Sequence, residues 1–188
     1  MQKHKIIFCR KGIISEFYTA VSKQSSLFNT KVNVDIVSYG AATNSIGYPR
    51  FYLANKYGKD IKSNGTAFNI YLCYDYQSVK FEQISPEIWI DIDDELINMF
   101  NNINVTHIIH KPSIEDWLFS DIQGLSRFFN KNVELQSDSG RNRLMEYYHA
   151  SGKAYVSSNE TECKKLISTL GIKRIATAHM EELTPLFL

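Results

Sequence analysis

The sequence predicts an α/β fold, in which a mainly parallel sheet is flanked by helices and a helical C-terminal part packs on it. Short apolar runs typical of buried strands recur along the first part of the chain, at residues 5–9, 32–39, 68–74 and 105–109. Segments with the spacing of amphipathic helices separate these runs. Strands that alternate with helices indicate right-handed crossovers between parallel neighbours.

The composition predicts one globular, cytoplasmic domain. Of the 188 residues, 44% are hydrophobic and 22% are charged, and the net charge is +1. No overall field attracts nucleic acid, so such binding requires a local basic patch. No apolar run approaches the ~18–20 residues that span a membrane, and the three cysteines lie in no paired spacing. We expect residues 1–188 to form a single domain, with an α/β core over 3–121 and a helical extension over 122–188.

The elements of the first half follow from local patterns. Residues 5–9 form an apolar strand that Arg10-Lys11-Gly12 ends, and Glu16 lies at the start of the next helix. Residues 32–39 alternate β-branched side chains, as strands do. Pro49 fits the following helix only near its first turn. The strand over 68–74 ends at Asp75, a polar segment continues to residue 86, and a helix is expected over 91–102.

The stretch that follows residue 105 predicts a strand that leads directly into a helix. Pro112 lacks an N–H donor and biases Lys111 toward extended backbone, so the strand should end there. Ser113 is a natural N-cap, and Glu115 and Asp116 fall in the first turn, where the helix dipole favours negative charge. Further helices are expected at residues 122–130, 141–150, 160–170 and 176–187.

Charged side chains should gather where the parallel strands end. This edge receives Lys11 and Glu16, then Asp75, then His110 and Glu115. Carboxylates that converge at one edge are suitable ligands for Mg²⁺ or Mn²⁺, so we expect Asp75, Glu16 and Glu115 near a metal ion. Lys11 or His110 would then lie near a scissile phosphate. The alternative is that these residues have only structural roles. Asp75 would then be a turn residue at a strand end, Glu115 an acid that suits the helix dipole, and His110 part of a solvated strand end.

A second basic group lies in the C-terminal part. Arg141, Arg143 and Lys153 are interleaved with tyrosines, a pattern that can hold a nucleic-acid strand by phosphate contacts and base stacking. The pattern equally fits a helix with a solvated face. Glycine-rich phosphate-binding fingerprints and the Gly-x-Ser-x-Gly motif are absent, which disfavours P-loop ATPases, Rossmann dehydrogenases and serine hydrolases.

The order of these features resembles a known family. A first strand ends near a glycine and a helix-opening Glu16, a later strand ends at Asp75, and the stretch K-P-S-I-E-D-W-L-F-S-D follows from Lys111. This arrangement resembles the Toprim-like proteins of the RloB and OLD-associated type in bacterial anti-phage systems. The resemblance covers residues 3–130 in outline, and its most specific part is the stretch at residues 112–121. The resemblance implies a Toprim-like sheet and a metal-dependent nuclease for DNA or RNA, in a defence or mobile-element setting, with a protein partner such as an ATPase.

The chain departs from that family at two positions. Arg10-Lys11-Gly12 stands where the family has Glu-Gly, and Asp75-Tyr76-Gln77 stands where it has Asp-x-Asp. One hypothesis is therefore an active nuclease with a reduced metal site. The other is a catalytically degenerate module that binds nucleic acid or a partner protein, with Lys or Arg contacting a phosphate in place of the metal. An unrelated α/β protein with a small-molecule site is a third possibility.

Overall fold

The computed structural model describes residues 2–24, 33–40, 47–62, 66–76, 103–134 and 138–187. The helix expected over 91–102 and nearly all of the polar segment before it lie outside the described residues.

The described part of the chain contains a four-stranded, all-parallel sheet with the order β2-β1-β3-β4. The strands are β1 (Gln2–Arg10), β2 (Asn33–Tyr39), β3 (Thr66–Asp75) and β4 (Ile103–His110). Each predicted apolar run is a strand. The runs in the central strands β1 and β3 are mostly buried, as in a sheet covered on both faces, whereas β2 and β4, at the edges of the described sheet, are only partly buried. In the register of the sheet, Asp75 lies opposite His110. The prediction of an α/β fold with a parallel sheet is confirmed.

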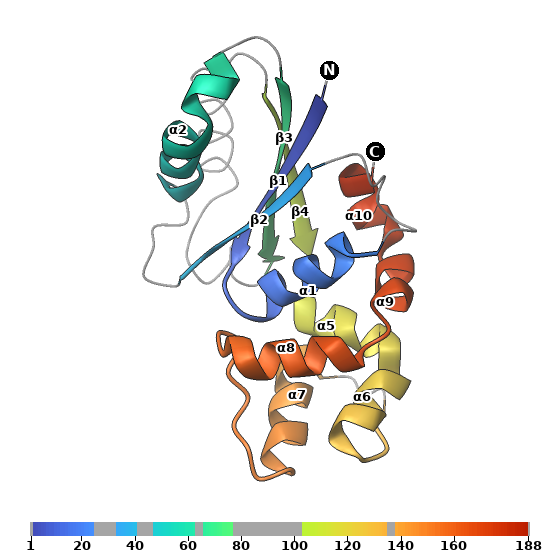
Figure 1. The fold of residues 1–188 in the computed structure, drawn as a ribbon. Coiled ribbons are helices and arrows are strands. Elements are labelled where there is room, and N and C mark those ends of the chain that lie inside the picture. The colour runs from blue at the N-terminus through green and yellow to red at the C-terminus, as the bar shows by residue number, and fades with distance from the viewer. Residues whose placement is uncertain are drawn as a thin grey trace.

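Helices cover both faces of this sheet. Helix α2 (Gly47–Lys62) lies on one face, and α1 (Ile13–Ser22) lies on the other with α9 (Ile172–Ala178) and α10 (Met180–Phe187) (Figure 1). Pro49 occupies the first turn of α2, as expected, since its missing N–H has no helical partner there. The single helix predicted over 176–187 is two helices, and the break comes at His179.

The remaining helices lie beyond the carboxyl ends of the strands (Figure 1). They are α5 (Ile114–Leu118), a short 3-10 turn (Phe119–Asp121), α6 (Ile122–Phe129), α7 (Gly140–His149) and α8 (Glu160–Thr169). The helical C-terminal part predicted from the sequence is thus confirmed. No helix in the described residues has the length and apolar character to cross a membrane.

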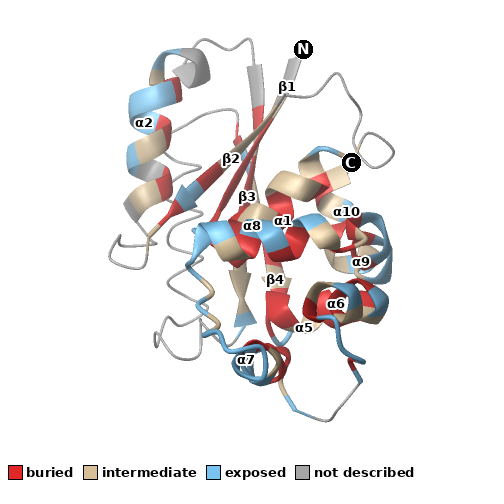
Figure 2. Cartoon of the chain, turned by 60° about the horizontal axis from the view of Figure 1, so that its bottom comes forward, coloured by how far each residue is buried: buried red, intermediate tan, exposed pale blue. Residues whose placement is uncertain are grey.

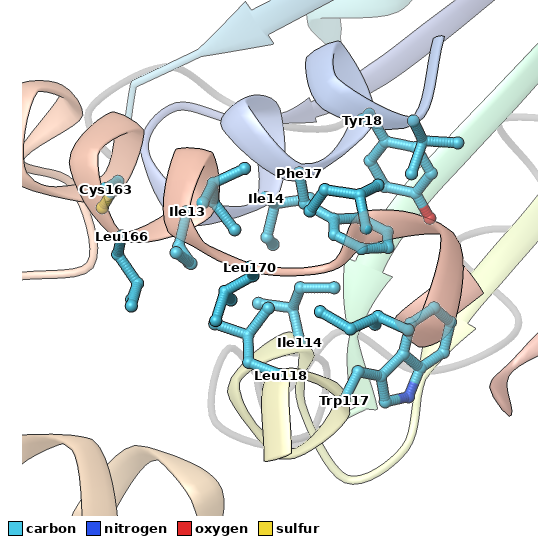
Figure 3. Packing of buried hydrophobic residues seen from close by; sticks show 14 of the residues in the cluster. Ile13, Ile14, Phe17, Tyr18, Ile114, Trp117, Leu118, Cys163, Leu166 and Leu170 are labelled. Carbon is cyan, nitrogen blue, oxygen red and sulfur yellow. The ribbon is translucent and has the colours of Figure 1, made fainter. Parts of the chain in front are cut away.

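Two hydrophobic clusters hold the layers together. The smaller one lies between the sheet and α2 and includes Phe8, Leu53 and Ile70. The larger one is continuous from the sheet through α1 into the C-terminal helices (Figure 2). In Figure 3, apolar side chains of α1 face those of α5 and α8, among them Phe17, Ile114 and Leu166. Each such side chain stabilises the fold by about 1.5–3 kcal/mol when fully buried, so these contacts fix the helical part against the sheet edge.

Candidate functional site

A cavity of about 220 Å³ lies at the carboxyl edge of the sheet. Its wall carries the cationic residues Arg10, Lys11 and Arg141 and the carboxyl groups of Asp75 and Glu115. Tyr39, Gly40, Ser157 and Ser158 also line it, with apolar residues from the start of α1. The edge beyond the carboxyl ends of the strands is where open α/β sheets bind ligands. We call this cavity the edge pocket.

One wall of the edge pocket depends on a close approach at Gly12. This residue has φ +106°, a conformation that favours glycine, and an added Cβ would collide with the carbonyl oxygen of Ser157 and lie 2.7 Å from Cα of Ser158. The N–H of Ile13 also donates to the Ser157 carbonyl oxygen at 2.8 Å. The segment before α8 is therefore held against the end of β1, which brings both serines to the pocket.

A second close approach places α7. The N–H of Gly140 donates to Oδ1 of Asp116 at 2.6 Å, and a Cβ on Gly140 would lie 2.6 Å from the carbonyl carbon of Glu115. Only a glycine lets the first turn of α7 lie directly on the backbone of α5. Arg141, the next residue, thereby reaches the pocket that Glu115 lines.

Asp75 is anchored by two donors at the end of β3. Its Oδ1 accepts hydrogen bonds from the N–H of Ile114 at 2.7 Å and from Nδ1 of His110 at 2.9 Å. Ser113, the N-cap of α5, makes no side-chain cap bond, and its hydroxyl donates to Oδ2 of Asp116 instead. The start of α5 is thus capped by Asp75, from the end of β3. The same hydrogen bonds fix the Asp75 carboxylate in the pocket wall.

His110 was expected beside a phosphate, but it is fully buried and reaches the pocket only through Asp75. A carboxylate only accepts hydrogen bonds, so Nδ1 carries a hydrogen and donates it. Nε2 then accepts from the hydroxyl of Tyr18 at 2.9 Å in the neutral tautomer. Burial, followed by the neighbouring Cys73, raises the pKa of Tyr18 well above its usual value, so this hydroxyl keeps its proton.

Glu115 has a different environment from Asp75. It is 3% exposed, and its Oε1 accepts a hydrogen bond from the hydroxyl of Tyr155 at 3.1 Å. Burial raises the pKa of Glu115, and the charge of Asp75 raises it further. Burial also raises the pKa of Tyr155, which therefore stays a donor. Hydrogen bonds from Ser113 and Tyr155 act on Glu115 in the opposite direction, and the net effect is a raised pKa of Glu115.

The cations of the edge pocket are more exposed. Nζ of Lys11 lies 3.2 Å from a carboxylate oxygen of Glu160, and the two side chains are 50% and 46% exposed. An ion pair at this exposure contributes little, about 0–1 kcal/mol, so Lys11 can exchange Glu160 for a bound anion. Arg141 is exposed in the first turn of α7. Three cationic side chains and two carboxyl groups thus line this cavity.

Besides His110, three residues of the predicted sites do not line this pocket. Glu16 is half-buried on α1, and its charge adds to the burial that raises the pKa of Cys163 in α8 to about 12. Lys153 is exposed and lies 3.7 Å from a carboxylate oxygen of Glu162. Arg143, expected at a nucleic-acid surface, is 6% exposed, with its guanidinium 3.6 Å from the ring centroid of Phe119. That expectation is corrected, because packing against an aromatic ring removes Arg143 from the surface.

The donors of the pocket do not fit Mg²⁺ or Mn²⁺. Such ions take several oxygen ligands, whereas one oxygen of Asp75 already accepts two N–H hydrogen bonds and Glu115 is buried against the hydroxyl of Tyr155. Glu16, the third predicted ligand, is not among the residues that line the pocket. Across the described ranges, no three His, Cys, Asp or Glu side chains are grouped so that they could hold a metal ion. The cationic wall would also repel a divalent ion.

Two pocket residues carry no local sequence signal. Ser157 and Ser158 follow α7 in an irregular segment, and the tertiary contact at Gly12 brings them to the sheet edge. The sequence shows Gly12 just after the first strand. It does not predict that Gly12 contacts Ser157, which lies 145 residues later.

In comparisons with known proteins, no protein-family model, no curated protein and no solved structure matches the chain.

Proposed function

We propose that this protein is a Toprim-like module that binds a phosphate group of a nucleic acid in the edge pocket, with fixed cations in place of a metal ion. The observation that carries the proposal is the set of three cationic side chains, Arg10, Lys11 and Arg141, that line one cavity at the carboxyl edge of the sheet. Lys11 occupies the strand end where the resembled family has its metal-binding glutamate. A cation at that position attracts the same phosphate that a metal would attract.

Further features support a nucleic-acid ligand. Ser157 and Ser158 offer hydroxyl donors beside the cations, and Ser, Lys and Arg side chains are the usual partners of phosphate oxygens. Tyr76 directly follows Asp75 and is 53% exposed. An exposed aromatic ring next to a phosphate site can stack on a base, which contributes about 1–3 kcal/mol per base.

The proposal is tested by the affinity of the full chain for a single-stranded oligonucleotide with 2′-O-methyl riboses, followed by fluorescence anisotropy. Lys11→Met and Arg141→Met should each weaken binding by about 10- to 100-fold, since hydrogen bonds to charged groups contribute about 1.5–3 kcal/mol. Each should also lower the slope of log affinity against log salt by about 0.7. EDTA should leave the affinity unchanged.

Lys165→Met is the matched control. Lys165 is an exposed lysine on α8 that pairs with Glu162 at 2.7 Å, as Lys11 pairs with Glu160, but it does not line the pocket. Lys165→Met should change neither the affinity for the oligonucleotide nor the slope of log affinity against log salt. Equal effects of Lys11→Met and Lys165→Met would reduce binding to general surface charge and contradict the proposal. A requirement for Mg²⁺ would restore the metal-dependent nuclease as the better hypothesis.

A further inference from the structure

The edge pocket has room for only part of a nucleotide. Its volume is about 220 Å³, whereas cavities that enclose a whole small ligand usually measure about 300–1,000 Å³. The described residues that line it come from the ends of β1, β2 and β3, from the starts of α1, α5 and α7, and from the segment before α8. A cavity of this size can enclose a phosphate group, and the rest of the ligand must lie outside it.

The polar side chains of the pocket suit a phosphate with three terminal oxygens. Lys11 and Arg141 are exposed cations that come from different elements. Arg10, Ser157 and Ser158 line the same cavity, and serine hydroxyls also donate to phosphate oxygens. A phosphate monoester has three terminal oxygens and a charge of about −1.5 to −2 at pH 7. A phosphodiester inside a strand has two such oxygens and one negative charge, so a monoester uses these donors more fully.

The carboxyl groups in the pocket wall are held by donors of the chain itself. One oxygen of Asp75 accepts hydrogen bonds from the N–H groups of Ile114 and His110. Glu115 is buried and accepts a hydrogen bond from the hydroxyl of Tyr155. Such hydrogen bonds offset part of the negative charge that a bound anion would meet.

A carboxylate already lies on one of the exposed cations. Nζ of Lys11 is 3.2 Å from a carboxylate oxygen of Glu160, which begins α8, and the two side chains are 50% and 46% exposed. The close approach of Gly12 to Ser157 holds this end of α8 beside the end of β1. A ligand anion must take the place of Glu160 on Lys11. Electrostatic attraction grows with the charge of the ligand, so a monoester displaces this carboxylate more readily than a diester does.

We propose, on the basis of the nucleic-acid binding proposed above, that the edge pocket receives the phosphate monoester at an end of a nucleic-acid strand. The terminal phosphate lies between Lys11 and Arg141 and replaces Glu160 on Lys11. A monoester has its chain on one side only, so it can enter a small cavity while the bases stay outside. An internal phosphodiester needs space for the chain on both sides of the phosphorus. Tyr76 directly follows Asp75 and is 53% exposed, so its ring is available to the terminal base.

The experiment compares three forms of one 2′-O-methyl oligonucleotide, with a 5′-phosphate, with a 3′-phosphate, or with hydroxyl groups at both ends. Each form competes with an internally labelled strand that carries a phosphate at both ends and is bound to the full chain, and fluorescence anisotropy gives the affinity. We expect one monoester to bind about 10-fold more tightly, or more, than the strand without end phosphates, because it adds hydrogen bonds to charged donors. The form that gains affinity identifies the end that the pocket receives.

Substitution of the cations tests where the terminal phosphate lies. Lys11→Met and Arg141→Met should each lose most of the preference for the phosphorylated end, because they remove the charges that the additional negative charge contacts. Lys165→Met should retain the preference, since Lys165 does not line the pocket.

Glu160→Gln should have the opposite effect. The variant removes the carboxylate that competes for Lys11, so affinity for the preferred end should rise by up to about 5-fold, as expected for an exposed ion pair. Glu162→Gln is the matched control on the same helix, because Glu162 pairs with Lys153 and Lys165 away from the pocket. An equal rise for both variants would reduce the effect to general surface charge and contradict the place given to the terminal phosphate.

The outcomes separate this inference from the proposed function. Equal affinity for the three forms of the oligonucleotide overturns the inference and leaves the phosphate-binding function standing. Absence of binding by all three overturns both. A preference for the phosphorylated end that persists in Lys11→Met and Arg141→Met places that end elsewhere and overturns the inference. Adenosine 5′-monophosphate that binds as tightly as the phosphorylated strand would assign the pocket to a free nucleotide and overturn both.

Discussion

Three acids within one short stretch have three different tasks. Glu115 lies in the edge pocket, and Asp116 receives the N–H of Gly140 and so anchors α7. Asp121 is 1% exposed and accepts hydrogen bonds from the N–H groups of Gly124 and Gly171 and from Arg174. Acids near a helix start suit the helix dipole, and that local rule predicted the position of Glu115 and Asp116 without distinguishing their partners.

Replacement of Asp121 by alanine should strongly destabilise the fold. The change removes the buried carboxylate that joins α6 to the start of α9, and it leaves the N–H of Gly171 without this acceptor. Arg174 is 56% exposed and stays solvated, so the main cost is the N–H donors left without an acceptor, about 1–3 kcal/mol each where they are buried. Urea unfolding of the full chain measures this loss.

Asp138→Ala is the matched control at the surface. Asp138 is exposed and accepts local bonds from Ser139 and Asn142, so its loss should change the free energy of unfolding by less than about 0.5 kcal/mol. Similar losses for the two variants would contradict the role given to Asp121.

At the scale of elements, the contact between α5 and α7 decides whether a pocket exists. The sequence predicted a helix that starts after Ser113 and another over 141–150, and the structure has α5 at Ile114–Leu118 and α7 at Gly140–His149. It did not predict that they touch, because the contact depends on the absence of a side chain at Gly140 and on one hydrogen bond to Asp116. Neither feature leaves a periodic pattern in the sequence, so the contact could not be predicted from it.

Gly140→Ala should therefore affect both stability and binding. A Cβ there collides with the backbone of α5, which cannot yield as a flexible side chain can, so α7 must move away and carry Arg141 with it. Overpacking of this kind costs about 1–3 kcal/mol. We expect weaker binding of the 2′-O-methyl oligonucleotide together with a lower free energy of unfolding.

Gly58→Ala is the control for Gly140→Ala. Gly58 lies inside α2, and an added Cβ meets nothing within 4 Å. Alanine is the better helix former, so this variant should gain about 0.5–1 kcal/mol of stability and leave oligonucleotide affinity unchanged. A loss of stability at Gly58 comparable to that at Gly140 would show that general helix effects explain both.

At the scale of the whole molecule, the sequence predicted the layers better than the site. Four strands, their parallel arrangement and the helical C-terminal part followed from apolar runs and their spacing. The register that sets Asp75 opposite His110 could have suggested their hydrogen bond. The burial of His110 and Arg143 could not be predicted, since it depends on which faces of the C-terminal helices meet the sheet edge.

The stability of the whole molecule should depend on pH through Glu115. The pKa of Glu115 is raised in the folded state, with burial as the main cause, above the ordinary value of 4.5. The folded state therefore binds more protons than the unfolded state just above pH 4.5, and unfolding free energy falls as pH rises through the folded-state pKa. Glu115→Gln removes this titration, so the stability of the variant relative to wild type should increase as the pH rises above about 4.5 and should level off above the folded-state pKa.

Urea unfolding of both proteins over that pH range measures the difference. Below the ordinary glutamate pKa both carry an uncharged side chain at this position, so their difference there reports packing alone. Parallel stability profiles for wild type and Glu115→Gln would mean that Glu115 titrates as it does in the unfolded chain.

The two glycine contacts at the pocket also bear on how a bound ligand would leave. One wall of the cavity belongs to the sheet edge and the other to segments that begin after residue 138, joined at Gly12 and Gly140. A ligand that contacts both walls links them, and its binding energy adds to the free energy needed to separate them. Local opening of α7 and α8 would break the cavity before the sheet unfolds, so the dissociation rate would follow the opening rate of these helices.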